Sequence, residues 1–507
     1  MLVSTALNIA LLLASAALGA QITTTTRQTI NGIGASGAWW PNDLALFPSE
    51  VRQNISQLLL NQTSGLGLTD YRYNLGGGGV GVGTFARAPE TPYVSDGVYN
   101  FSADPQGTFF LREAARQGVP LITLFVNSAP TTFTTNGQNC GGNLITSRIP
   151  EYAQYLADVI SYWKTQGVEI THVSPMNEPD STFGSGDPNT LCGQEGMEVT
   201  PAQRAEVVTT LAAALKDAGL STRVIADESS STGNFENDAP VWLGSSGVGE
   251  ALAGIAHHQY GFASGPTQQA MAELGRNLSG GVSTWFTEIC CYVQVDSSEA
   301  DDPLATLTYG GQYDPTMVSA LRMANLIFQS FTFAEDEHWD WWTALSSELG
   351  SCSPSSDASC VNAVNPDGWD DGLLYYDPNY ASTGFYGLGV SKRYSVLRHF
   401  TKAAPVGAVR RNVSLSASES AWLVLAFDTD PACAPFATCS AAPFSVVAAN
   451  AQGGAATLTL TSALSQPTAA FRTSPTEDWA EVAAPTLAAD GSLVIEAPGL
   501  SVYTLFF

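Results

Sequence analysis

Charged side chains, and basic ones above all, are scarce in this chain of 507 residues. Lys and Arg number 20 against 47 Asp and Glu, so the formal net charge is −27 at pH 7. Such a surface repels phosphate backbones, which argues against nucleic acid as a partner. Only 13% of the residues are charged whereas 10% are aromatic. Disordered chains do not have this composition, so we expect a folded protein.

Several motifs of common site types are also missing. Beyond the N-terminus no stretch reaches the ~20 apolar residues of a membrane span, and no Cys-x-x-Cys spacing suggests zinc. The absence of a Gly-x-Ser-x-Gly elbow argues against a serine hydrolase of the α/β type. The glycine-rich run at residues 76–83 lacks the following Lys-Ser/Thr of a phosphate-binding loop, so we expect a flexible loop near a cleft.

The pattern of residues 1–20 predicts a secretion signal. An apolar run ends there in small residues, which fits cleavage after Gly19 or Ala20, although no Lys or Arg precedes the run. Asn-x-Ser/Thr sequons and an even number of cysteines agree with an extracellular, disulfide-bonded glycoprotein. We therefore expect a secreted protein, a monomer, with no membrane attachment after signal cleavage. The sequons begin at Asn54, Asn61, Asn100, Asn277 and Asn412.

The eight cysteines suggest specific pairs. Cys290 and Cys291 are adjacent, and they form either a vicinal disulfide or two bonds to other cysteines; the sequence leaves both open. The other pairs that we expect from short loops or similar loop composition are Cys352–Cys360, Cys433–Cys439 and Cys140–Cys192.

Short apolar runs alternate with amphipathic stretches between residue 30 and about residue 342, which is typical of βα units. Eight such alternations predict a (β/α)8 barrel over residues 31–400 rather than an open sheet. After Pro405 the helical periodicity disappears, and short β-rich segments predict an antiparallel β-sandwich over residues 401–507. The expected barrel strands are 30–37, 68–75, 120–126, 170–176, 222–227, 254–260, 283–288 and 337–342.

Two carboxylates stand at the ends of expected barrel strands. Asn177-Glu178-Pro179 closes the fourth strand, and Thr287-Glu288 closes the seventh. Active sites of such barrels form at these strand ends, so the two side chains can reach either side of one scissile bond. Glycoside hydrolysis uses that arrangement, with one acid for the leaving oxygen and one carboxylate for the anomeric carbon.

Other strand ends add polar and aromatic candidates. Arg72, on the second strand, can hold a nucleophilic carboxylate ionised, or it can form a structural ion pair beneath the site. His257 and His258 face opposite ways, so at most one points into the barrel, and we expect no metal because no third ligand has a suitable spacing. A tryptophan of the eighth strand can form a floor on which a sugar stacks, and we expect this to be Trp341. The residues expected to bind substrate are Asn127, Asn177, Arg72, His258, Tyr260 and Trp341.

In this order, the residues resemble glycoside hydrolase family 30, a retaining family with a (β/α)8 barrel and a β-sandwich side domain. The resemblance covers nearly the whole chain after the signal. It is carried by Gly32-Ile-Gly-Ala-Ser-Gly, Arg72, Asn177-Glu178-Pro179, His258-Gln259-Tyr260, Thr287-Glu288, Asp340-Trp341, Gly387-Leu-Gly-Val-Ser-Lys-Arg-Tyr, Arg472-Thr473-Ser474 and Ser501-Val-Tyr-Thr.

The resemblance implies roles for individual residues. Glu178 would be the acid/base and Glu288 the nucleophile of a reaction that retains the anomeric configuration, with carboxyl groups ~5–5.5 Å apart. Glu178 must be protonated to start a turnover, so its pKa should be the higher of the two. Asn177 would bind the sugar 2-hydroxyl and Tyr260 would lie beside Glu288. The segment 21–30 would pair with the sandwich. No cofactor is implied.

The segment after the third strand bears on the substrate. Asn127-Ser-Ala-Pro resembles the corresponding stretch of fungal endo-β-1,6-galactanases more than that of xylanases or glucosylceramidases. We therefore expect a polysaccharide partner, β-1,6-galactan side chains of arabinogalactan. The alternatives are β-1,6-glucan, glucuronoxylan or xylan, and a catalytically silent carbohydrate-binding protein on the same fold. Endo or exo action stays open.

Overall fold

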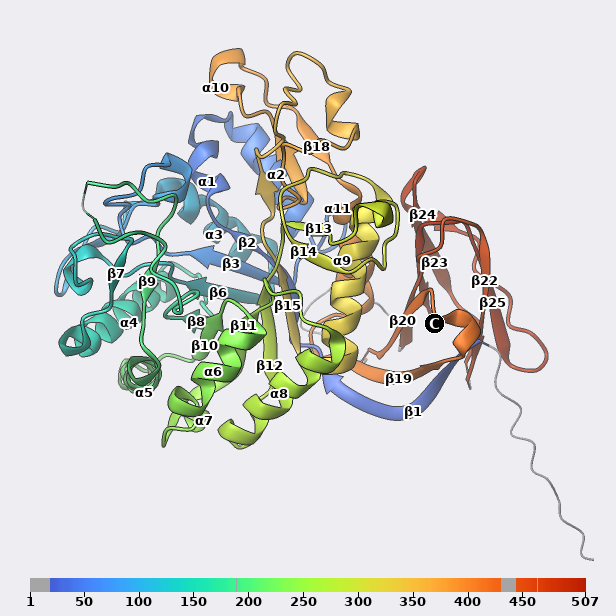
Figure 1. Cartoon of the computed structure of the whole chain (residues 1–507), viewed down its shortest axis with the longest axis horizontal. Helices are drawn as coiled ribbons and strands as arrows, with labels where there is room; N and C mark the ends of the chain where they lie inside the picture. The colour runs from blue at the N-terminus through green and yellow to red at the C-terminus, as the bar shows by residue number, and fades with distance from the viewer. Residues whose placement is uncertain (1–18, 188, 430–443, 463) are drawn as a thin grey trace, which may run out of the picture.

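Two bodies make up the molecule (Figure 1). The computed structural model describes residues 19–187, 189–429, 444–462 and 464–507. A barrel with helices around it fills one side of the view, and a β-sheet body, drawn mostly in orange and red with strand β1 in blue, lies on the other. Residues 1–18 of the expected signal peptide and the expected Cys433–Cys439 pair lie outside the described residues. None of the helices in the described ranges has the length and apolar character needed to cross a membrane.

The barrel consists of eight parallel strands. In chain order they are β2 (Gly32–Gly37), β3 (Asp70–Asn74), β6 (Leu121–Phe125), β8 (His172–Ser174), β10 (Arg223–Ser229), β11 (Leu252–His258), β12 (Thr284–Glu288) and β15 (His338–Trp341). Each strand pairs with the next along the chain, and β15 pairs back with β2. Every expected strand overlaps one of these, so the predicted (β/α)8 fold is confirmed.

Amphipathic helices cover the outside of the barrel. Helix α5 (Pro201–Asp217) illustrates how the sequence sets their ends: Thr200 and Gln203 form a capping box, and Gly219 follows with φ of 65°. The other long helices are α2 (Ser49–Leu60), α3 (Pro105–Gln117), α4 (Ile149–Thr165), α6 (Thr232–Trp242), α8 (Gly265–Ser279), α9 (Met317–Gln329) and α11 (Lys392–Ala403).

Short helices and strands form in the segments that connect the main elements. Two of them matter for the site, the hairpin strands β13 (Tyr292–Gln294) and β14 (Leu307–Tyr309). The remaining ones are α1 (Trp40–Asp43), α7 (Val248–Ala251), α10 (Tyr380–Thr383), β4 (Tyr93–Ser95), β5 (Val98–Tyr99), β7 (Gly142–Asn143), β9 (Met197–Glu198), β16 (Leu345–Ser346), β17 (Leu374–Tyr376) and β18 (Leu388–Val390).

The second body is a nine-stranded sheet wrapped around its own apolar core. Its order is β24-β23-β26-β21-β20-β19-β1-β22-β25. All pairings that the strand registers give are antiparallel except β1 with β22, which is parallel. The strands are β1 (Ala20–Thr29), β19 (Val409–Leu415), β20 (Trp422–Asp428), β21 (Phe444–Asn450), β22 (Ala456–Thr461), β23 (Ala469–Ser474), β24 (Glu477–Val482), β25 (Ser492–Ala497) and β26 (Ser501–Phe506).

Two strands of this body, β19 and β24, were not expected from the sequence. Adjacent arginines interrupt the apolar alternation of β19, and the fold accommodates them because Arg411 pairs with Asp428 of β20 at 2.6 Å. Strand β24 begins with two acidic residues and lies at one end of the sheet order. Charged side chains are common on such edge strands because they discourage pairing with other chains.

Strand β1 and helix α11 join the two bodies (Figure 1). Along β1, Ala20 pairs with Leu415 and Thr29 pairs with Val409 just before the chain enters the barrel. His399, buried on α11, makes 2.8 Å hydrogen bonds to the hydroxyls of Thr473 and Thr504 in the sheet body. The sheet body thereby packs against helix α11 on the outer side of the barrel.

Candidate active site

A cleft of about 660 Å³ lies at the carboxyl ends of the barrel strands. Its walls include Asn127 after β6, Asn177 and Glu178 after β8, Tyr260 after β11, and Glu288 at the end of β12. These five residues come from four separate strands, and the parallel order of the barrel gathers them at one end. All five were expected from the sequence to belong to the site.

Glu178 and Glu288 face each other across this cleft. One carboxylate oxygen of Glu178 lies within 4.8 Å of one carboxylate oxygen of Glu288. Both residues are largely buried, with 9% of Glu178 and 4% of Glu288 exposed. Glu178 adopts φ of 44°, a left-handed conformation that is uncommon for residues other than glycine and concentrates at functional sites.

Arg72 of β3 contacts Glu288 from within the barrel and is fully buried. Its Nη1 donates to Oε2 of Glu288 at 2.5 Å, and its Nη2 donates to the side-chain oxygen of Asn177 at 2.8 Å. Nη2 also lies 3.2 Å from Oε2 of Glu228. Burial opposes the charge of Arg72, but the carboxylates around it raise its pKa, so the guanidinium stays charged. One planar cation thus orients three side chains of the site.

His258 of β11 connects Glu178 to Glu228. Its Nδ1 lies 3.1 Å from Oε1 of Glu178, and its Nε2 lies 2.8 Å from Oε2 of Glu228. Burial would lower the pKa of His258, but the surrounding carboxylates, those of Glu288, Glu178 and Glu228, raise it to about 10. At neutral pH the ring is therefore an imidazolium that donates a hydrogen bond from each nitrogen.

Glu228, near the end of β10, is a member of the site that sequence analysis missed. It is fully buried and accepts a 2.5 Å hydrogen bond from the hydroxyl of Thr287. Burial alone would raise its pKa, but Arg72 and His258 hold the pKa of this carboxyl well below its usual range. Its place in Asp227-Glu228, after the expected fifth strand, was the signal that could have identified it.

The two carboxylates that line the cleft have different surroundings. Burial raises the pKa of Glu178, and the hydrogen bond and charge of His258 offset only part of this effect. Glu288 is held at both oxygens, by Arg72 on Oε2 and by the hydroxyl of Tyr260, which donates to Oε1 at 2.9 Å. Glu178 therefore has the environment of a proton donor, and Glu288 has that of a fixed carboxylate.

Three residues expected to bind substrate do not reach the cleft surface. Arg72 and His258 are fully buried and act on the two carboxylates from behind. Trp341 is also fully buried, and its indole nitrogen donates to the backbone oxygen of Asp371 at 2.7 Å, so the expectation that it stacks on sugar is wrong. Strand β15 ends at Trp341, and its neighbour Trp342 lines the cleft instead.

Besides Trp342, three aromatic rings that the sequence did not single out complete the cleft wall. Trp39 meets Trp342 edge to face with ring centres 4.6 Å apart. Tyr309 lies 5.6 Å from Trp369, and all four rings line the cleft. Such rings offer faces against which the C–H groups of sugars pack.

A metal was not expected because His258 lacked a third ligand at suitable spacing in the sequence. That premise is wrong in three dimensions, because Glu178, His258 and Glu288 each place one potential ligand atom within 4.8 Å of the others. The surroundings nevertheless do not fit a cation, since the Arg72 guanidinium already contacts Glu288 and both nitrogens of His258 contact carboxylates. The three residues form a hydrogen-bonded acid–base cluster.

The glycine-rich segment 76–83 is anchored rather than flexible. The backbone N–H groups of Gly77 and Gly79 donate to the buried carboxylate of Glu195 at 3.1 and 2.8 Å. The N–H of Val80 donates to the side chain of Asn139 at 2.8 Å. Amides that a phosphate would need are thus occupied by the protein's own side chains.

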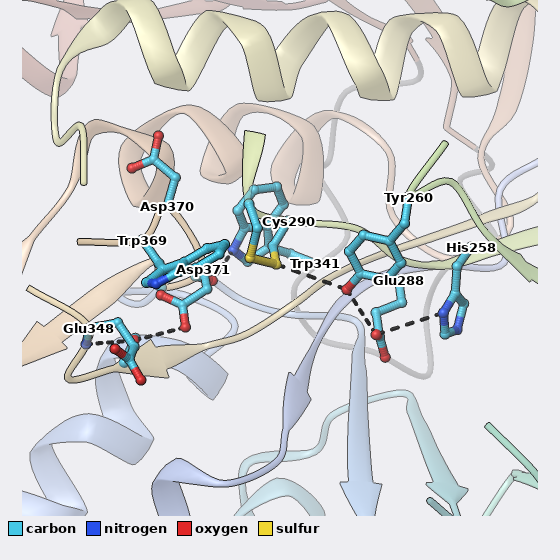
Figure 2. Close-up of a disulfide and its surroundings, with 12 residues drawn as sticks. His258, Tyr260, Glu288, Cys290, Trp341, Glu348, Trp369, Asp370 and Asp371 are labelled. Carbon is cyan, nitrogen blue, oxygen red and sulfur yellow. Dashed lines mark hydrogen bonds and ion pairs between the residues drawn. A yellow bond between two sulfur atoms is a disulfide. The ribbon is translucent and has the colours of Figure 1, made fainter. Parts of the chain in front are cut away.

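Three disulfides lie within the described part of the chain. The expected pairs Cys140–Cys192 and Cys352–Cys360 are both present. The alternative that the sequence left open is decided in favour of a vicinal Cys290–Cys291 bond, which lies at the cleft next to Tyr260 and Glu288 (Figure 2).

The sequence and fold are similar to those of known proteins. Residues 20–240 match the model of O-Glycosyl hydrolase family 30. An exo-β-1,6-galactobiohydrolase from Bifidobacterium longum subsp. longum is 27% identical over 168 residues, which cover 24% of this chain and 11% of that protein. The chain thus matches about a tenth of the length of this curated relative.

Solved structures share the two-body architecture. A conserved exported protein from Bacteroides fragilis superposes with a TM-score of 0.76 at 19% identity, covering 96% of this chain and 100% of that one. The catalytic domain of the family 30 xylanase C from Talaromyces cellulolyticus gives 0.67 at 22% identity, covering 96% and 99%. At these identities the likeness establishes the fold.

Proposed function

We propose that this chain is a secreted, retaining endo-β-1,6-galactanase. The match of residues 20–240 to the family 30 model and the fold shared with a family 30 xylanase support a glycosyl hydrolase. The observation that carries the retaining mechanism is the distance of 4.8 Å or less between carboxylate oxygens of Glu178 and Glu288. Retaining glycosidases place their carboxyl groups ~5–5.5 Å apart, whereas inverting ones need ~6.5–9.5 Å to admit a water.

In the first step, Glu178 gives its proton to the glycosidic oxygen while an oxygen of Glu288 attacks the anomeric carbon. The bond from that carbon to the leaving sugar breaks, and a glycosyl ester on Glu288 forms. Burial favours the protonated form of Glu178 that this step requires. Arg72 and Tyr260 hold the two oxygens of Glu288, so the attacking carboxylate does not have to be oriented during the reaction.

In the second step, the roles of Glu178 are reversed. Its carboxylate, now without the proton, takes a proton from a water whose oxygen attacks the anomeric carbon and releases Glu288. Two displacements on opposite faces of the sugar retain the configuration. The imidazolium of His258, 3.1 Å from Glu178, stabilises the ionised form that exists between the two steps.

The charge of the cleft supports a neutral glycan as substrate. Glu288, Glu348 and Asp371 line it beside the proton-donating Glu178, and Arg87 is the single Lys or Arg among the described lining residues. Arg87 is already engaged, since it lies 3.4 Å from Glu348 and 3.9 Å from the ring centre of Trp39. A glucuronate group would therefore be repelled, which favours β-1,6-galactan over glucuronoxylan.

Substrate choice within neutral glycans rests on the similarity to a β-1,6-galactan-directed relative and on the Asn127 segment. β-1,6-Glucan is the second candidate, and xylan or a silent carbohydrate-binding role are the remaining ones. Asn127 lines the cleft, where its amide can bind a sugar hydroxyl, and Asn177 does the same beside Glu178.

We expect reducing sugar to be released from de-arabinosylated arabinogalactan, and not from β-1,6-glucan or glucuronoxylan, by the wild type. The test compares the three polysaccharides and separates the products by size, so that a ladder of oligosaccharides indicates endo action. Glu348→Gln removes a cleft carboxylate other than Glu178 and Glu288, so it is the control for variants that lose one of those two carboxylates. Release from glucan alone would replace the substrate assignment, and silence on all three would favour the binding protein.

The pH dependence of kcat/KM should move when His258 loses its charge. Because the hydrogen bond and charge of His258 lower the pKa of Glu178, the His258→Asn change should raise that pKa further. Activity falls as pH rises through the pKa of the acid, so the alkaline limb should shift to higher pH in the variant.

His257→Asn is the matched control, since His257 pairs with Asp336, 3.1 Å away, rather than with the catalytic pair. Its alkaline limb should stay where the wild type has it. An unchanged limb in His258→Asn, with a normal melting temperature, would show that His258 does not tune Glu178.

A further inference from the structure

The vicinal disulfide occupies a position that the proposed mechanism leaves unused. Cys290 and Cys291 follow Glu288 by two and three residues, and both line the cleft (Figure 2). Their exposed fractions, 2% and 5%, are comparable to the 4% of Glu288, whose carboxylate has to touch the substrate. Both cysteines therefore line the cleft and are about as exposed as the residue proposed as nucleophile.

The backbone around these cysteines is held by other contacts. The N–H of Gly310, next to β14, donates to the carbonyl of Cys291 at 2.9 Å, and the N–H of Trp342 donates to the carbonyl of Ile289 at 3.0 Å. Glu288 itself is fixed by Arg72 and Tyr260. These hydrogen bonds already fix the position of the loop and of Glu288. Restricting their conformation is therefore not the main consequence of the sulfur–sulfur bond.

The chemistry of the disulfide suits an apolar contact. Two bonded sulfur atoms are polarisable and lack a hydrogen-bond donor, so they interact well with C–H groups and poorly with hydroxyls. Within the described residues, the side-chain hydrogen-bonding contact of the Cys290 sulfur is to the hydroxyl of Tyr260 at 3.9 Å, and that hydroxyl donates to Glu288 at 2.9 Å. The disulfide thus presents an apolar patch in a cleft otherwise rich in carboxylates and hydroxyls.

We propose that the Cys290–Cys291 disulfide is a substrate-binding surface that contacts the C–H face of the sugar bound on the Glu288 side of the cleft. That sugar is the one whose anomeric carbon becomes bonded to Glu288, because the disulfide lies two and three residues after Glu288 and beside Tyr260, which contacts Glu288, whereas Ser181 and Phe183 of the cleft follow Glu178. Trp342, held to the same loop, adds an aromatic surface. The inference rests on the proposed glycosidase function and adds a specificity determinant to it.

The test measures binding without catalysis. Glu288→Gln protein is titrated with β-1,6-galactotriose by calorimetry, with the disulfide intact and with Cys290→Ala and Cys291→Ala combined. We expect about tenfold weaker binding in the double variant, equivalent to about 1.4 kcal/mol. Cys290→Met with Cys291→Ala should recover part of the affinity, because the thioether restores an apolar sulfur. Cys352→Ala with Cys360→Ala removes a disulfide outside the cleft and should leave binding unchanged.

Kinetics with the native Glu288 distinguish contact from stiffening. Loss of a binding surface should raise KM with little change in kcat, whereas a loosened nucleophile should lower kcat for every substrate. If the alanine pair does not fold, Cys290→Ser with Cys291→Ser replaces it, with the same weaker binding expected. Equal affinity with and without the disulfide would overturn the inference and leave the proposed function standing. Failure of galactotriose to bind even the intact-disulfide protein would instead contradict the galactanase assignment.

Discussion

Glu288→Gln should lower kcat on β-1,6-galactan by about 10⁴-fold or more, because an amide cannot form the glycosyl ester on which double displacement depends. The glutamine keeps the shape of the side chain, so it can still accept from the Tyr260 hydroxyl that contacts Oε1 in the wild type. Reducing-sugar release measures the loss. A melting curve shows whether the variant remains folded after Arg72 loses one of its two carboxylate partners.

A covalent label makes the assignment specific. A 2-deoxy-2-fluoro-galactoside with a good leaving group should leave a sugar on the peptide that contains Glu288 in the wild type, and on no peptide in the variant, as read by mass spectrometry. Glu348→Gln removes a carboxylate from the same cleft and should still be labelled. A sugar attached to any other residue, or an unchanged hydrolysis rate in Glu288→Gln, would refute the nucleophile assignment.

Glu178→Ala should reduce hydrolysis of the polysaccharide by about 10²- to 10⁴-fold, since proton transfer to the leaving oxygen is lost. A dinitrophenyl β-galactoside, whose leaving group needs no proton, should still form the glycosyl ester at close to the wild-type rate. Deglycosylation then becomes slow, because no base activates water. Stopped-flow absorbance should therefore show a burst of dinitrophenolate followed by a slow phase.

Azide provides the decisive control for this role. It attacks without giving up a proton, so it should accelerate the slow phase of Glu178→Ala and yield a β-galactosyl azide, while the wild type shows no such acceleration. The variant should also lose the alkaline limb of the pH profile, which in the wild type reflects the pKa that burial raises at Glu178. An α-galactosyl azide product would instead identify Glu178 as the nucleophile.

The order of strand ends explains why the sequence could place Glu178 and Glu288 together in one cleft. Glu178 and Glu288 were assigned because each follows an apolar run of the correct ordinal number, and parallel strands of a closed barrel bring their carboxyl ends together. Asn177 and Tyr260 lie at strand ends in the same way, and both line the cleft. A local pattern sufficed because position along the strand already determines which end of the barrel a residue occupies.

The residues around the pair show where this reasoning stops. Trp341 and Trp342 are chemically identical neighbours, yet one is fully buried and the other lines the cleft. Glu228 has the same side chain as the two catalytic candidates, but it is fully buried against Arg72 and His258 and does not line the cleft. Side-chain chemistry alone therefore did not separate a wall residue from a supporting one.

The sequence by itself determined the (β/α)8 barrel, the additional β body, and the placement of two carboxylates at the ends of barrel strands. These follow from periodicity and from chain order, which are properties of short segments. Only the tertiary structure decided that Cys290 bonds to Cys291, that Trp342 rather than Trp341 meets the cleft, and that His258 bridges Glu178 and Glu228. Those outcomes depend on distances between residues far apart in the chain, and these distances are set by the packing of the whole barrel.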